Sequence, residues 1–150
     1  MKISYSTITL RYVHDVVTGE FANIGVVLYA PKQRFLKARF TTSHRRLDAM
    51  FLKIDHLYFS ALTRHIANAF AEMSAQIQNG ETVPPVTSLS EMVKQILPPD
   101  DSSLQWSEQG GGFSDEPAKK LDELYQRLVE RYRAGSERET SSLSASNQTT

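Results

Sequence analysis

The sequence contains no cysteine, and this absence excludes several classes of chemistry at once. Disulfide bonds, thiolate zinc sites, iron–sulfur clusters and a catalytic cysteine all require a thiol group. The chain also lacks any apolar run near the roughly 20 residues that a membrane-spanning helix needs, and its first six residues do not lead into the apolar segment of a signal peptide. We therefore expect a cytoplasmic protein with no membrane partner.

Motifs for cofactors, metals and common nucleophiles are missing as well. The sequence has no phosphate-binding loop ending in Gly-Lys-Ser or Gly-Lys-Thr, no dinucleotide-binding fingerprint and no nucleophile elbow. Its four histidines do not show the spacing of a metal site. His65 lies on an apolar helical stripe, where a packed core residue is the ordinary interpretation. We expect no cofactor, no metal and no catalytic residue.

Charge is balanced over the whole chain but unevenly distributed along it. Seventeen basic residues match seventeen acidic residues. Residues 1–40 carry six Lys or Arg against Asp15 and Glu20, a balance of +4, whereas residues 81–115 carry Lys94 against six acidic residues, a balance of −5. The N-terminal segment is therefore where an anionic partner would bind.

Length and composition indicate one folded domain followed by a polar tail. The chain has 150 residues, of which 40% are hydrophobic and 23% are charged, as is typical of a single globular domain. Residues 135–150 are mostly Ser, Thr, Asn, Gln and charged residues, which cannot bury a core. We predict a single domain over residues 1–134 and a disordered tail over residues 135–150.

The first 40 residues predict three β-strands. Ile3–His14 and Glu20–Pro31 are rich in Ile, Val, Thr and Tyr, and the segment between them ends in Gly19, which favours a hairpin turn. A third strand is expected over Phe35–Phe40. Alternation of apolar and polar residues assigns the core side of these strands to Ile8, Leu10, Tyr12, Ala22, Ile24, Val26, Leu28, Leu36, Ala38 and Phe40.

Beyond residue 40 the hydrophobic period changes to three and four residues, which indicates helices. A long amphipathic helix is predicted over Asp55–Asn79, before Gly80. The other expected elements are, in chain order, a short helix over Ser43–Phe51, a short helix over Leu89–Leu97 capped by Thr87 or Ser88, a short strand over Leu104–Trp106, a flexible link at Gly110–Gly112 and a helix from Pro117 to about Ala134. These elements predict an α+β fold in which helices pack on one face of an antiparallel sheet of three to four strands.

The turn between the first two strands carries the most distinctive polar residues. A register that pairs His14 with Glu20 also pairs Arg11 with Asn23, in agreement with the hydrophobic pattern. In this register Glu20 points toward the core beside His14. The arrangement fits an acid–base pair, but two buried polar groups that satisfy each other are the simpler interpretation.

Gly25 interrupts the second strand at the position expected to lie opposite Thr9. A glycine inside a strand indicates either a β-bulge or the close approach of another backbone or of a ligand. We favour the bulge.

The strand face opposite the apolar side chains combines basic and aromatic residues. If helices cover only one side of the sheet, this second face is open. A solvated face is the ordinary interpretation, although basic side chains interleaved with aromatics can also grip phosphates and stack bases. His44, Arg45 and Arg46 extend the positive region. The residues expected on this face are Tyr5, Thr7, Thr9, Arg11, Asn23, Tyr29, Lys37 and Arg39.

Several segments together resemble a known family. They are Arg11-Tyr12-Val13, the run from Gly19 to Leu28, His44-Arg45-Arg46-Leu47, and the run from Pro117 to Tyr125. The chain resembles, over roughly residues 3–132, the uncharacterised bacterial family called domain of unknown function 3037. The resemblance implies a compact bacterial domain and brings no established reaction. Similar proteins are often encoded beside HipA-like kinases, which implies an accessory or regulatory partner.

We therefore predict a non-enzymatic binding or regulatory module that acts through a protein partner, with a HipA-like kinase as a candidate. One alternative is a nucleic-acid-binding protein that uses the basic and aromatic sheet face, and the other is a small hydrolase that uses His14 and Glu20. The residues predicted to bind are Arg11, Glu20, Asn23, Gly25, Lys37, Arg39, Arg45 and Arg46.

Overall fold

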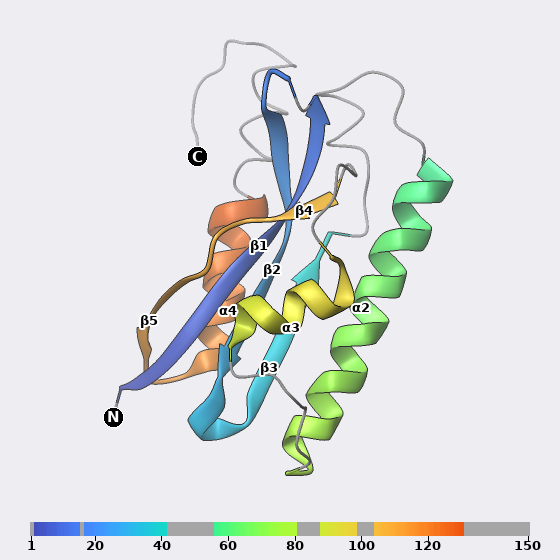
Figure 1. The fold of residues 1–150 in the computed structure, drawn as a ribbon. Coiled ribbons are helices and arrows are strands. Elements are labelled where there is room, and N and C mark those ends of the chain that lie inside the picture. Colours follow the sequence, from blue (N-terminus) through green and yellow to red (C-terminus); the bar gives the residue numbers. More distant parts are fainter. Residues whose placement is uncertain (1, 16, 42–55, 81–87, 99–103, 131–150) are drawn as a thin grey trace.

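The computed structural model describes residues 2–15, 17–41, 56–80, 88–98 and 104–130 (Figure 1). The helix predicted at Ser43–Phe51, the basic residues Arg45 and Arg46, and the tail predicted at 135–150 lie outside these residues. Among the helices of the described part, none is both long and apolar enough to cross a bilayer.

Five antiparallel strands form one sheet. They are β1 (Ile3–Asp15), β2 (Glu20–Ala30), β3 (Phe35–Phe40), β4 (Leu104–Trp106) and β5 (Gly110–Ser114). The strand order is β3-β2-β1-β4, and β5 also pairs with β1. The predicted antiparallel α+β class is confirmed, and the sheet has one strand more than the upper expectation.

Strands β4 and β5 share one edge of β1. The first lies opposite Leu10–Tyr12 and the second opposite Ile3–Thr7. The expectation of a flexible link at Gly110–Gly112 is wrong, because these glycines belong to β5. A Cβ atom on Gly111 would lie 2.8 Å from the backbone oxygen of Tyr5, so glycine permits the close approach of β5 to β1.

The β1–β2 hairpin contains the predicted bulge. Asn23 lies opposite Arg11, as predicted, but the next β1 residue, Leu10, lies opposite Gly25. Ile24 is therefore the extra residue of the bulge. Gly25 lies opposite Leu10 and not opposite Thr9, which corrects the predicted register at this point.

The bulge also divides the apolar side chains of β2 between two cores. Val26 and Leu28 were expected on the same side as Ile24. Instead they join a separate cluster, whereas Val27 packs with Ile24. The extra residue reverses the alternation of the remaining strand, so simple alternation assigned Val26 and Leu28 to the wrong face.

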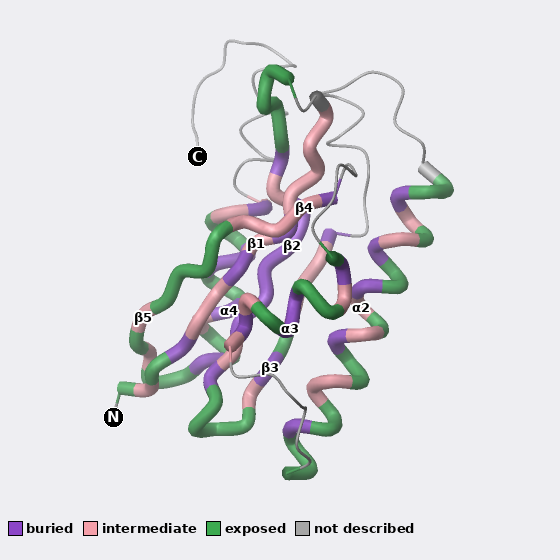
Figure 2. The backbone as a smooth tube through the Cα atoms, in the orientation of Figure 1, coloured by how far each residue is buried: buried purple, intermediate pink, exposed green. Residues whose placement is uncertain are grey.

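Each face of the sheet is covered by helices (Figure 1). The long helix α2 (His56–Gln78) and the short helix α3 (Leu89–Ile96) pack on the predicted core face. Helix α4 (Pro117–Tyr125) and the π-helical turn η2 (Gln126–Glu130) pack on the opposite face. The expectation of helices on one face therefore holds for α2 and α3, while α4 adds a third layer. Figure 2 shows that the buried residues of β2 lie between these layers.

Local signals account for where the helices begin and end. The Ser88 hydroxyl accepts a hydrogen bond of 3.3 Å from the backbone N–H of Glu91, so the predicted cap of α3 is confirmed. Pro117 occupies the first turn of α4, where its missing N–H costs nothing. Gly80 follows α2 with φ of +79°, a conformation that glycine adopts readily.

Candidate functional site

Arg39, one of the predicted binding residues, is held by α4. Its Nη1 donates a hydrogen bond of 3.0 Å to Oδ1 of Asp122. Its guanidinium carbon also lies 4.2 Å from the centroid of the Tyr125 ring, which is cation–π geometry. Since α4 engages the charge and one flat side of the guanidinium, Arg39 primarily joins the helix to the sheet.

Asn23 and Arg11 lie side by side on the same face, nearer the β1–β2 turn. The Asn23 side-chain amide donates a hydrogen bond of 3.2 Å to the backbone oxygen of Leu128 in η2. The Arg11 guanidinium lies 4.4 Å from the centroid of the half-exposed Phe21 ring. The structure therefore brings Arg11, Asn23 and Arg39 onto one face as predicted, but that face is covered and not open.

Tyr125 completes a polar seam between α4 and the sheet. Burial raises the pKa of its phenol, and the charge of Glu130 and a hydrogen bond to it raise the pKa further. A hydrogen bond with Thr41 and the charge of Arg39 act in the opposite direction. The phenol thus stays protonated at neutral pH and contributes hydrogen bonds to the seam. We define the polar seam as Asn23, Arg39, Thr41, Asp122, Tyr125 and Glu130.

Gly25 has a structural role. A Cβ atom at this position would lie 2.1 Å from Cδ1 of Phe40, its cross-strand neighbour on β3. The Phe40 ring packs in turn against Phe70 of α2, with 6.2 Å between ring centroids. The close approach that glycine permits here is that of a core side chain.

Glu20 and His14 do not form the predicted cross-strand pair. A register shift between Val13 and Asp15 places Glu20 opposite Asp15. The Glu20 side chain is exposed, in contrast to the coreward orientation predicted for it. The His14 ring instead approaches Tyr12, with 6.1 Å between centroids. The hydrolase alternative therefore lacks the paired geometry on which it was based.

The other predicted residues lie apart from the polar seam. Lys37 is exposed on β3, and Arg45 and Arg46 lie outside the described residues. The nucleic-acid alternative consequently lacks the open sheet face that it requires. Binding through these residues stays a prediction.

The outer edge of β5 is a candidate site that the sequence reasoning missed. This strand pairs with β1 on one side and has no second strand neighbour in the described part of the chain. It is the outermost strand at its side of the sheet (Figure 1). Phe113 within it is 68% exposed. The available signal was the run of three glycines at Gly110–Gly112. A glycine run predicts a flexible link, so the strand was not predicted.

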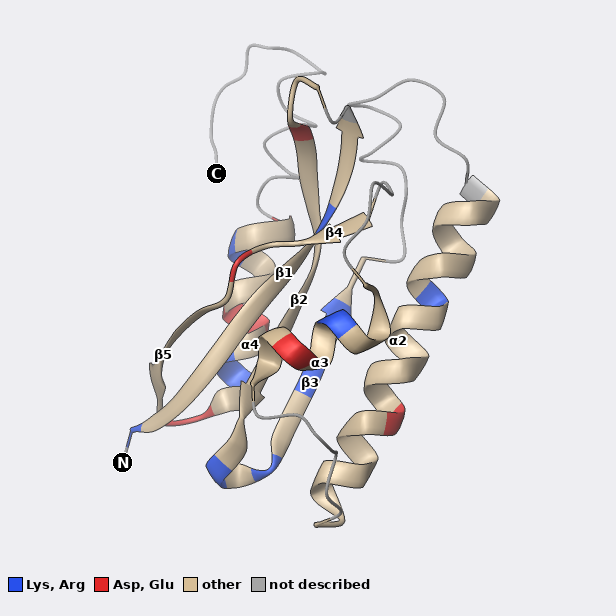
Figure 3. Ribbon diagram, viewed as in Figure 1, with Lys and Arg blue, Asp and Glu red and all other residues tan. Residues whose placement is uncertain are grey.

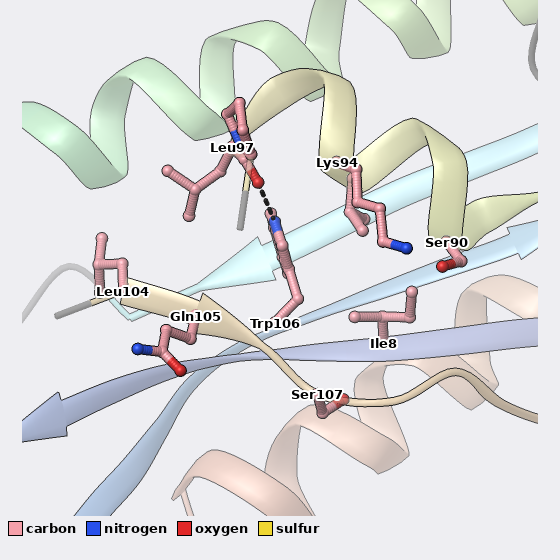
Figure 4. Close-up of a pocket in the computed structure, with 10 residues that line it drawn as sticks. Ile8, Ser90, Lys94, Leu97, Leu104, Gln105, Trp106 and Ser107 are labelled. Carbon is pink, nitrogen blue, oxygen red and sulfur yellow. Dashed lines mark hydrogen bonds between the residues drawn. The ribbon is translucent and has the colours of Figure 1, made fainter. Parts of the chain in front are cut away.

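A pocket between α3 and β4 is a second site that sequence reasoning missed (Figure 4). Its volume is about 240 Å³. The Trp106 indole forms part of its wall and donates a hydrogen bond of 3.1 Å from Nε1 to the backbone oxygen of Leu97. The pocket depends on the meeting of α3 and β4 with β1, which lies far from both in the sequence.

The described residues hold no group of three or more His, Asp or Glu side chains placed to bind a metal ion. Among the features they offer are a strand edge and the small pocket between α3 and β4. Both are suited to binding, by backbone pairing in the first case and by enclosure in the second.

Comparison with known proteins gives one result. Residues 5–129 match the model of a family described as "Protein of unknown function (DUF3037)", which confirms the resemblance seen in the sequence. No curated protein and no solved structure matches the chain.

Proposed function

The chain belongs to the DUF3037 family, and we propose that it is a non-enzymatic binding module. It holds an extended segment of a partner protein on the outer edge of β5. The proposal is based on geometry, because the description of the family names no activity. The observation that carries the proposal is this unpartnered edge strand, Gly110–Ser114. Addition of a strand to an exposed sheet edge is a recurring mode of peptide recognition, in which main-chain hydrogen bonds supply much of the affinity.

The composition of β5 favours strand addition. Natural sheet edges are usually guarded by charged side chains, by proline or by a covering element. Strand β5 has neither charge nor proline between Gly110 and Ser114. Its glycines carry no side chains above or below the sheet that could clash with those of an incoming strand, and the exposed Phe113 offers an apolar contact beside them.

Charge indicates the chemistry of the partner segment. Glu108 and Glu116 stand at the two ends of β5, and both are exposed. Figure 3 shows acidic residues at each end of the β5 ribbon. Neither residue forms an ion pair within the described part of the chain. A segment with Lys or Arg on both sides of a short, uncharged strand would complement this edge.

The same charges disfavour a second copy of the chain as the occupant. An antiparallel pair of β5 strands centred on Gly112 would place Glu108 of one copy opposite Glu116 of the other. Like charges opposite each other in a sheet are destabilising. A different protein is therefore the better fit, and the HipA-like kinase expected from the resemblance is the first partner to test.

The experiment compares Phe113→Asp with Leu57→Asp in a pull-down of the tagged full chain from its native host, with nuclease added. Leu57 is 85% exposed at the start of α2, so it is a matched control for loss of a surface apolar side chain. We expect Phe113→Asp to lower recovery of the partner at least about tenfold, because it places a charge inside the paired edge, and Leu57→Asp to leave it unchanged.

Amide hydrogen exchange on the recovered complex locates the contact. Strand addition predicts slower exchange within residues 110–114 when the partner is bound. Protection confined to the β1–β2 turn, where Val17 is 94% exposed, would move the contact to that turn and reject the β5 proposal. A self-associated chain with no partner would reject it as well.

A further inference from the structure

The pocket between α3 and β4 has an apolar floor and one charged side chain at its rim. Ile8, Val93 and Leu104 are each at most 2% exposed, and together with Leu97 and Trp106 they give the pocket its apolar surface. The volume of about 240 Å³ lies somewhat below the roughly 300–1,000 Å³ typical of ligand pockets. A small ligand with an apolar body would therefore fit.

Two sets of polar groups can be assigned a role in the pocket, which Gln105 of β4 also lines. The first set builds its walls: the Trp106 indole N–H is bound to the Leu97 carbonyl, and the Ser107 hydroxyl accepts from the Thr9 N–H at 2.9 Å while donating to a backbone oxygen. These groups are already satisfied. They hold β4 against α3 and β1 and so shape the pocket. Recognition of a ligand is left to other polar groups.

The second set consists of Lys94 and Ser90. They lie four residues apart on α3, a spacing that places them on the same face of the helix. Figure 4 shows both side chains on the α3 side of the pocket, across from β1 and β4. Neither the Lys94 ammonium nor the Ser90 hydroxyl has a hydrogen-bond or ion-pair partner among the described residues. One cation and one hydroxyl therefore stand beside the apolar part of the cavity.

We infer that this pocket binds a small amphipathic monocarboxylate, with its carboxylate at Lys94 and Ser90 and its apolar body against Trp106, Leu97 and Ile8. The single positive charge matches a single negative charge, and the hydroxyl supplies a second donor. A cation would be repelled by Lys94, and a neutral molecule would gain no attraction from its positive charge. This inference is independent of the partner proposed for β5.

The chain provides its own reporter, since Trp106 is its single tryptophan and lines the pocket. The full chain is titrated with octanoate and followed by tryptophan fluorescence, with octanol as the neutral molecule of equal length. We expect a saturable change with octanoate and affinity about tenfold weaker with octanol.

The variant Lys94→Gln tests the role assigned to the ammonium. It should reduce octanoate affinity to about that of octanol, whereas Lys32→Gln, at an exposed lysine of the turn η1 (Pro31–Gln33), should not. Because Lys94 is exposed, the variant is expected to fold, and circular dichroism checks this. No saturable response to octanoate, equal affinity for octanol, or unchanged affinity in Lys94→Gln would each overturn the inference.

Discussion

The two faces of the sheet are covered in different ways. On the face of α2 and α3, apolar side chains such as Phe59, Ile66 and Phe70 pack directly on the strands. On the face of α4, a smaller apolar cluster is accompanied by the polar seam, in which Arg39 and Asn23 hold α4 and η2 by side-chain contacts. Exposed ion pairs contribute little to stability, so the apolar contacts of α4 must supply most of its attachment.

This difference teaches that polar residues on a strand face do not by themselves mark a binding surface. Arg39 is basic and lies near aromatic Tyr125, which is the pattern expected of a nucleic-acid contact. In the structure the pattern is completed within the chain, because Asp122 supplies the negative charge. The surfaces proposed for binding are instead the ones that the helices leave uncovered.

The largest expected loss of stability comes from a substitution in the core on the face of α2 and α3. Ile66 of α2 is fully buried in the core between the helix and the sheet, so Ile66→Ala should lower the free energy of unfolding by about 2–5 kcal/mol through lost burial and a cavity. Chemical denaturation measures this change. Leu57→Ala, at an exposed position of the same helix, should change it by less than about 0.5 kcal/mol. Equal effects would contradict the assignment of the core.

A smaller effect is expected at the bulge that divides β2 between the faces. Gly25→Ala would bring a Cβ atom into the Phe40 ring, and we expect a loss of about 1–3 kcal/mol from overpacking. The comparison variant is Gly19→Ala, where an added Cβ meets nothing within 4 Å but φ is +79°.

The two glycine variants separate two physical causes. Gly25→Ala should cost less stability in a Phe40→Leu background, where the ring is absent, than in the original chain, as measured by the same denaturation experiment. The loss in Gly19→Ala comes from backbone conformation, so Phe40→Leu should not reduce it. A smaller cost for both glycine variants in the Phe40→Leu background would contradict the proposed clash.

The smallest effect concerns the polar seam and appears at alkaline pH. Because the pKa of Tyr125 is raised above its ordinary value of 10.0, its contribution to folding is fully present below pH 10.0 and is lost as pH rises through the higher folded pKa. Unfolding measured between about pH 9 and pH 11 should therefore depend less steeply on pH in Tyr125→Phe than in the original chain. An unchanged slope would show that this phenol does not contribute.

Local periodicity was sufficient to predict most helices and strands. The alternation in β1 and β3, the three- and four-residue period of α2 and the Ser88 cap of α3 all depend on neighbours in the sequence. The strand at Gly110–Ser114 was missed because glycine has weak strand propensity. Its pairing with β1 depends instead on a close approach to Tyr5.

The candidate site was predicted less well, for a specific reason. Gly25 correctly indicated a bulge, and Arg11 and Asn23 were correctly paired. The position of α4 could not be read from its apolar stripe, because such a stripe fits either face of a sheet. The open edge of β5 and the pocket beside Lys94 arise only where distant segments meet.

The sequence alone determined the absence of thiol chemistry, the antiparallel α+β class and most elements, because composition and short-range periodicity are local properties. Only the tertiary structure decided that α4 covers the basic strand face, that β5 forms an open sheet edge, and that α3 and β4 enclose a pocket. The physical reason is that a one-residue bulge redirects apolar side chains such as Val26 and Leu28 to a second core. That core positions α4, and the placement of the helices decides which edges and cavities stay available.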